Sequence, residues 1–302
     1  MKSTKKELFL HLLIFFFLLI IITCLCMTVY FDYVERQTSS KEFFLEYCTN
    51  NSYEINPLIC EHNEYKANHF PDTFQLFYSI VNSQFFWILE SIFPTLIIFM
   101  GIYKINSVFK SQFLKNLLTR ENYKKIYKSI IIDSYKNIWI IPLIMFYTFI
   151  LCCFMTNSNF DYSYAINTSA AVYNLNVIKY PGLFILTYII NLLFISVFYI
   201  NIGLLVCKKN SNSIISTTIA SIIYYIISFI NTFVIIPTIN KLLNTSVEGY
   251  ISFFDMYTYT DRTNLLGISL TSFSLAFISL LIVVIFYKNK EKTIIDFERM
   301  EE

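Results

Sequence analysis

The chain has 302 residues, of which 56% are hydrophobic and only 15% are charged. Together with a mean hydropathy of +0.54, this composition excludes an ordinary soluble domain. The net charge of +2 comes without a dense basic tract, which argues against binding to nucleic acid. Abundant Lys, Asn, Ile, Phe and Tyr beside only five glycines suggest an AT-rich genome, so we expect the cell membrane of a low-GC Gram-positive bacterium.

The N-terminus begins like a secretory signal peptide, because Lys2, Lys5 and Lys6 precede an apolar stretch. The stretch from Leu8 to Tyr30 is about 23 residues long, which exceeds the roughly 7–15 residues of a signal-peptide core. No small-x-small cleavage motif follows it. We therefore predict an uncleaved first transmembrane span.

Six apolar segments are long enough to cross about 30 Å of hydrocarbon as helices. They are residues 8–30, 85–107, 138–156, 181–206, 214–239 and 265–287. Helices are favoured over barrel strands because the segments are continuously apolar, whereas barrel strands alternate over about ten residues. The predicted fold class is an all-α integral membrane protein with six transmembrane helices.

The distribution of Lys and Arg predicts that both termini are cytoplasmic, because cytoplasmic loops are enriched in these residues. With the N-terminus inside, the cytoplasmic segments and Lys104 at a span end hold 17 basic residues. The outside segments hold six. The opposite orientation would invert a bias of nearly three to one.

Two of the predicted loops are large. Residues 31–84 form an outside segment with eight acidic residues, and residues 108–137 form a basic inside segment. The remaining loops are residues 157–180 and 240–264 outside, and 207–213 inside. Because no repeat or linker divides the chain, we predict one membrane domain, residues 1–302, with an extracellular loop subdomain at 31–84.

The inside segment 108–137 has helical periodicity. Apolar residues recur from Phe109 to Leu118, and again from Tyr123 to Ile131 after the polar break at 119–122. Two short amphipathic helices joined by a turn are predicted. They are either an interfacial pair whose lysines meet anionic headgroups or a docking element for a cytoplasmic partner.

This layout resembles the permease subunit of ABC-2 type ABC transporters, in which the loop between spans two and three carries a coupling helix for the ATPase. The stretch from Leu118 to Tyr127, LTRENYKKIY, is similar to the basic and aromatic stretch before span three in that family. The resemblance implies that ATPase coupling falls to Leu118, Arg120, Tyr123, Lys124, Lys125 and Tyr127.

Segment 240–264 resembles the short re-entrant external helices that these permeases place before span six. Its aromatic residues are equally compatible with an interfacial belt; with Met256 they are Tyr250, Phe253, Phe254 and Tyr257. The outside loop at 31–84, with 54 residues, departs from the compact members of the family.

The resemblance implies a permease that exports an amphipathic peptide, drug or lipid-like substrate. The chain contains no G-x-x-x-x-G-K-[ST] motif, so ATP and Mg would bind a separate cytoplasmic ABC ATPase, and this chain would hold no cofactor. A second permease chain would complete a homodimer or heterodimer surrounded by membrane lipid.

Two other functions remain open. One is a stand-alone secondary carrier, although inverted repeats and broken helices are not evident. The other is a non-transporting immunity or sensor protein whose outside loop binds a peptide. The chain is not expected to be an enzyme, because it has no H-E-x-x-H, G-x-S-x-G or paired intramembrane carboxylates.

Glu90 is the one carboxylate inside a predicted span, four residues before Pro94. Intramembrane ionisable residues usually face a cavity or a partner, which makes Glu90 and Pro94 candidates for a translocation pathway. The alternative is a glutamate solvated near the outer interface without a function. Pro142 and Pro237 are further candidates for helix kinks.

Cys48 and Cys60 both lie in the predicted outside loop, where disulfides persist. They are either bridged, which would stabilise the loop by about 2–3 kcal/mol, or two free thiols. The other five cysteines lie in spans or at span ends, where they behave as small apolar residues. The three histidines do not have the spacing of a zinc site, and no metal is predicted.

Overall fold

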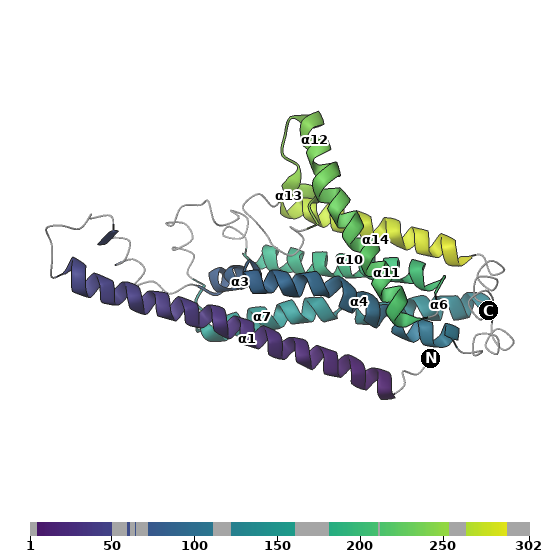
Figure 1. Ribbon diagram of the computed structural model, residues 1–302, viewed down its shortest axis with the longest axis horizontal. Coiled ribbons are helices and arrows are strands. Elements are labelled where there is room, and N and C mark those ends of the chain that lie inside the picture. Colours follow the sequence, from purple (N-terminus) through teal and green to yellow (C-terminus); the bar gives the residue numbers. More distant parts are fainter. Residues whose placement is uncertain are drawn as a thin grey trace.

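In the computed structural model, all regular secondary structure within the described residues is helical; these are residues 5–49, 59–60, 64, 72–110, 122–160, 181–210, 212–253 and 264–288. Figure 1 shows a bundle of long helices with one helical arm that leaves it. The elements are α1 (Lys5–Phe43), η1 (Phe44–Cys48), α3 (Thr73–Val81), α4 (Gln84–Lys110), α6 (Tyr123–Ser134), η2 (Tyr135–Asn137), α7 (Ile140–Met155), α10 (Pro181–Cys207), α11 (Ser213–Ile230), η3 (Asn231–Ile235), α12 (Ile236–Leu243), α13 (Glu248–Ile251) and α14 (Leu265–Lys288).

Six helices are long and apolar enough to cross a membrane, which confirms the predicted multi-pass membrane protein. The qualifying segments are Phe9–Cys48, Gln84–Tyr103, Ile131–Met155, Ile185–Cys207, Ser213–Leu243 and Leu266–Lys288. Each overlaps one of the six predicted spans. The first turns of α1, the last turns of α14 and α6 all lie toward the same end of the bundle (Figure 1).

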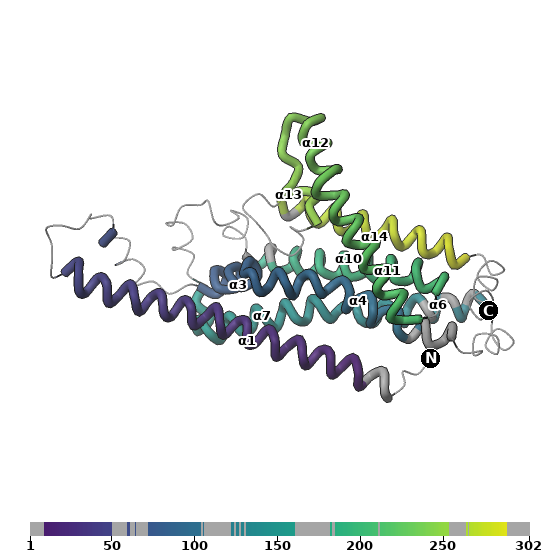
Figure 2. The backbone as a smooth tube through the Cα atoms, viewed as in Figure 1, coloured from purple at the N-terminus to yellow at the C-terminus, as the bar shows by residue number. Residues whose placement is uncertain are grey.

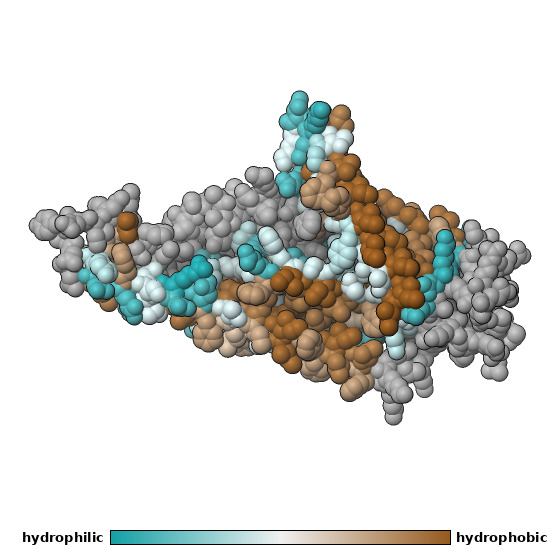
Figure 3. Space-filling model, in the orientation of Figure 1, coloured by the Kyte–Doolittle hydropathy of each residue, from teal (hydrophilic) through white to brown (hydrophobic). Residues whose placement is uncertain are grey.

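The first helix is much longer than its predicted span. At 39 residues it measures about 58 Å, whereas the hydrocarbon layer is about 30 Å thick. Its apolar part ends near Tyr30, and the residues beyond carry charges and amides. The last 13 residues, Phe31–Phe43, therefore form a polar helical stalk of about 20 Å. In Figure 3 the stalk is the largely hydrophilic extension at the left.

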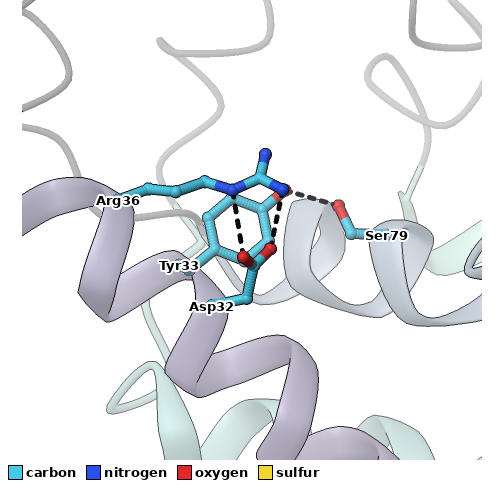
Figure 4. Close-up of polar contacts among 4 residues, drawn as sticks. All are labelled: Asp32, Tyr33, Arg36 and Ser79. Carbon is cyan, nitrogen blue, oxygen red and sulfur yellow. Dashed lines mark hydrogen bonds and ion pairs between the residues drawn. The ribbon is translucent and has the colours of Figure 1, made fainter.

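Part of the predicted loop subdomain at 31–84 is helical. Residues 31–43 continue α1, and α3 packs against α1 and α7 in the bundle. The Tyr33 hydroxyl and the Ser79 hydroxyl lie 2.7 Å apart and link the stalk to α3, while Arg36 and Asp32 form an exposed ion pair of 2.9 Å along the stalk (Figure 4). The described parts of this segment are thus helical and continuous with the bundle.

The core of the bundle is organised around α10, which packs against α4, α7, α11 and α14. Two glycines let α4 and α10 approach closely, as small residues do in membrane bundles. A Cβ atom on Gly101 would lie 2.9 Å from Ile200, and one on Gly203 would lie 2.8 Å from Ile102. Neither glycine can be enlarged unless the facing isoleucine moves.

The fifth span has its polar face inward and its apolar face outward, the reverse of a helix in a soluble protein. The buried residues of α11 are Ser216, Thr217, Ala220, Ser221, Tyr224 and Ser228. Its exposed side chains include Ile214, Ile222, Ile226 and Phe229. They form the apolar band over α11 in Figure 3, and this outward face matches a lipid environment.

The arm consists of η3 and α12, which continue α11 away from the bundle (Figures 1 and 2). Pro237 lies in the first turn of α12, directly after the π-helical turn η3. The chain returns through α13, which packs against α14, and the Tyr250 carbonyl accepts a 2.8 Å hydrogen bond from Thr271. Of the predicted aromatic segment, Phe254, Met256 and Tyr257 lie outside the described residues.

Candidate functional site

Glu90 lies in the second span on α4, at the interface with α11. Its Oε1 atom is buried and has no hydrogen-bond partner. A carboxyl group in this position has lost water on one side without gaining a donor from the protein, which is costly within a membrane span.

Pro94 leaves a second hydrogen-bond acceptor without a donor at the same place. It is buried inside α4, four residues after Glu90. Because proline has no N–H, the backbone carbonyl of Glu90 lacks its usual helical donor. The neighbouring Ser91 carbonyl accepts a hydrogen bond from the Tyr225 hydroxyl of α11. This bond fixes the two helices together beside the proline.

The α11 side of this interface is polar and incompletely paired. The Tyr199 hydroxyl of α10 donates to the Tyr224 hydroxyl at 3.3 Å, and the two rings meet edge-on with centroids 4.8 Å apart. Ser221, one turn from Tyr224, is 6% exposed, and its Oγ atom is buried without a partner. We call Glu90, Ser221, Tyr224 and Tyr225 the Glu90 cluster.

A second polar layer joins α10 to α14, and its groups are paired. The Ser272 hydroxyl donates to Asn191 Oδ1 at 3.1 Å. Asn201 Nδ2 donates to the Ser279 hydroxyl at 2.8 Å, while Asn201 Oδ1 accepts from the Tyr135 hydroxyl of η2. Both asparagines are fully buried. Asn201 therefore ties three elements together inside the bundle.

The predicted coupling segment is partly visible as α6. The Tyr123 hydroxyl donates a 2.6 Å hydrogen bond to the Tyr287 carbonyl in the last turn of α14. Ile126 is 4% exposed and joins the core, whereas Lys125 and Lys128 are exposed. The second of the two predicted amphipathic helices is thus present, with an apolar side on the bundle and a basic side facing away.

The remaining predicted coupling residues are less completely described. The backbone of Lys124 and Tyr127 lies within α6, and Leu118 and Arg120 lie outside the described residues, as does most of the first predicted amphipathic helix. The end of α14 that α6 contacts is also held from the other side, because Lys208 Nζ donates to the Phe286 carbonyl at 2.6 Å. Three segments meet there.

Cys48 and Cys60 form a disulfide with Cα atoms 5.6 Å apart, at the far end of the α1 stalk. Cys24, Cys26, Cys152, Cys153 and Cys207 are free thiols. Within the described ranges, no group of three or more His, Cys, Asp and Glu side chains is arranged to hold a metal ion.

Sequence reasoning found Glu90 and Pro94 but missed the side chains around them. The signal was present, because polar residues recur at helical spacing through the apolar fifth span, from Ser216 through Tyr224 to Ser228. The role of Asn201 had no comparable signal, since its partners Tyr135 and Ser279 are distant in sequence.

No family model, no curated protein and no solved structure matches this chain. The interpretation of its function therefore depends on the residues and geometry described above. Two features stand out: a helix with a basic outer side anchored to α14, and an intramembrane carboxyl group with unpaired acceptors beside it.

Proposed function

We propose that the chain is the permease subunit of an ABC-2 type exporter, which moves an amphipathic substrate and is driven by a separate cytoplasmic ATPase. In this proposal both termini are cytoplasmic, and two permease chains pair around the pathway. The observation that carries the proposal is α6, whose Tyr123 is bonded to α14 while Lys125 and Lys128 remain exposed.

The position of α6 suits a coupling element. It lies toward the end of the bundle where α1 begins and α14 ends (Figure 1), and the loop charges favour the cytoplasm for that end. A soluble partner that pushed on the exposed lysines would move α14 through the Tyr123–Tyr287 hydrogen bond. An interfacial helix that only met lipid headgroups would not need a bond to the backbone of a spanning helix.

The test is affinity purification of the tagged chain from its native host in mild detergent, followed by mass spectrometry. We expect a stoichiometric ABC ATPase, which is lost from the variant that combines Arg120→Ala, Tyr123→Ala and Lys124→Ala. A matched control combines Arg36→Ala and Lys41→Ala, which also removes basic residues but from the stalk at the other end of the bundle. This control should retain the ATPase.

Two results would contradict the proposal. The first is purification without any ABC ATPase, which would leave a carrier or a peptide-binding immunity protein. The second is equal loss of the ATPase from both variants, which would show that binding depends on basic charge in general rather than on α6.

Glu90 favours one alternative function, a secondary carrier that uses a proton or another cation. Carriers place ionisable groups within spans along the transport path, and Glu90 is such a group with a buried, unpartnered oxygen. Transport assays in liposomes without any ATPase separate the two functions. Uptake driven by a proton gradient and abolished by Glu90→Gln would favour the carrier.

A further inference from the structure

We propose that the Glu90 cluster binds the cationic amine of an amphipathic molecule at the interface of α4 and α11. As a statement about the transported substrate, this rests on the function proposed above. As a statement about binding, it stands on the geometry of the cluster alone.

Glu90 carries two hydrogen-bond acceptors that have no donor. Its Oε1 atom is buried without a partner. The Glu90 carbonyl has lost its helical donor to Pro94. The Tyr225 hydroxyl, which could have served as a donor, is used by the Ser91 carbonyl. A ligand that meets both acceptors of Glu90 therefore needs more than one N–H or O–H.

The missing group should also carry positive charge. Neither the Arg36–Asp32 nor the Lys136–Asp133 ion pair involves Glu90. A buried carboxylate is retained at lower cost when a cation with good hydrogen-bond geometry pairs with it. An ammonium group supplies one charge and three N–H donors, which matches the acceptors of the cluster.

The surroundings fit an ammonium that carries an apolar chain. Glu90 is only half-buried, so the cluster is open on one side. Trp87, one turn before Glu90 on α4, is 56% exposed, and Phe229, one turn beyond Tyr225 on α11, is 60% exposed. These side chains face the lipid. The ring faces of Tyr224 and Trp87 attract cations, and an alkyl chain would lie along the exposed apolar side chains.

The test is equilibrium binding of tritiated dodecylamine to the purified, tagged full chain on scintillation-proximity beads. We expect saturable binding that unlabelled dodecylamine displaces and that 1-dodecanol, which has the same chain without the charge, does not. Glu90→Gln should weaken binding about 30-fold or more, because it removes the charged partner of a buried pair. Glu46→Gln, an exposed carboxyl change on η1, should bind like the original protein.

Three outcomes would overturn the proposal: no saturable binding to the original chain, equal displacement by 1-dodecanol, or unchanged affinity in Glu90→Gln. Competition by 1-dodecanol is measured on the original chain, so the test survives if Glu90→Gln does not fold. The assay contains no ATPase. Amine binding without a co-purifying ATPase would therefore contradict only the exporter, and an ATPase without amine binding would contradict only this site.

Discussion

The interface of α10 with α14 and the interface of α4 with α11 both bury polar side chains. They differ in whether those side chains have hydrogen-bond partners. Between α10 and α14, the asparagines Asn191 and Asn201 each meet a serine of the facing helix. Between α4 and α11, Glu90 Oε1 and Ser221 Oγ have no partner. The polar groups of the first interface are paired with one another, whereas in the second the Tyr225 hydroxyl donates to the Ser91 carbonyl beside a proline.

This difference assigns separate roles to the two interfaces. In a membrane, paired polar groups stabilise helix association modestly, by roughly 0.6 kcal/mol each on average. Unpaired buried polar groups oppose association and persist where something else meets them. We therefore interpret α10 and α14 as the fixed part of the bundle, and α4 with α11 as the part that opens to a ligand.

The largest expected effect comes from Asn201→Leu. This change removes the amide that accepts from the Tyr135 hydroxyl and donates to the Ser279 hydroxyl inside the bundle, so we expect a loss of about 2 kcal/mol of unfolding free energy. The measurement is SDS-induced unfolding in mixed micelles, followed by circular dichroism. If Asn201→Leu unfolds at the same SDS fraction as the original chain, the fixed-interface interpretation is wrong.

At the interface of α4 and α11, we expect a substitution to raise the unfolding free energy instead of lowering it. Glu90→Leu removes a carboxyl group that has no donor and replaces it with an apolar side chain, so the same assay should show stabilisation of about 1 kcal/mol. Leucine also abolishes amine binding if the ligand proposal holds. Destabilisation by Glu90→Leu would instead indicate that the carboxyl group makes a stabilising contact and that the two interfaces do not differ in this way.

The spans were predictable because apolar runs of about 20 residues have few structural alternatives in a chain of this composition. The stalk was not predicted, because hydropathy identifies only the apolar part of a helix that lies in the membrane. Residues 31–48 contain no Gly or Pro, so nothing ends the helix there, and propensity alone would have extended it. The short helix α3 was not predicted, because its nine residues are too few to span a bilayer.

Of the candidate site, only Glu90 and Pro94 could be predicted from the sequence. A carboxylate in an apolar run stands out in a sequence, and so does the proline four residues later. The partners do not, because Ser221 and Tyr224 are unremarkable residues whose importance arises when α11 packs against α4. Tertiary contact, which one sequence does not display, decided which polar groups are paired and which are left without a donor.

A smaller effect is expected where α6 meets α14. Tyr123→Phe keeps the ring and removes only the hydroxyl that donates to the Tyr287 carbonyl, so stability should fall by about 1 kcal/mol. In a complex with an ATPase, the same variant should bind the ATPase but transport more slowly. Arg36→Ala, which breaks an exposed pair with Asp32, is the control and should change neither property. Normal transport by Tyr123→Phe would exclude this bond as the coupling route.

The smallest effect is a contrast between two serines that differ in pairing. Ser272→Ala removes a hydrogen bond to Asn191 and should cost about 0.6 kcal/mol. Ser221→Ala removes a buried hydroxyl without a partner, so it should cost nothing or stabilise slightly. Because the substitution is identical and both sites are buried in spanning helices, the difference in SDS unfolding isolates the pairing itself. Equal costs would mean that the Ser221 hydroxyl is bonded within the bundle, and that the two interfaces do not differ in the pairing of their serines.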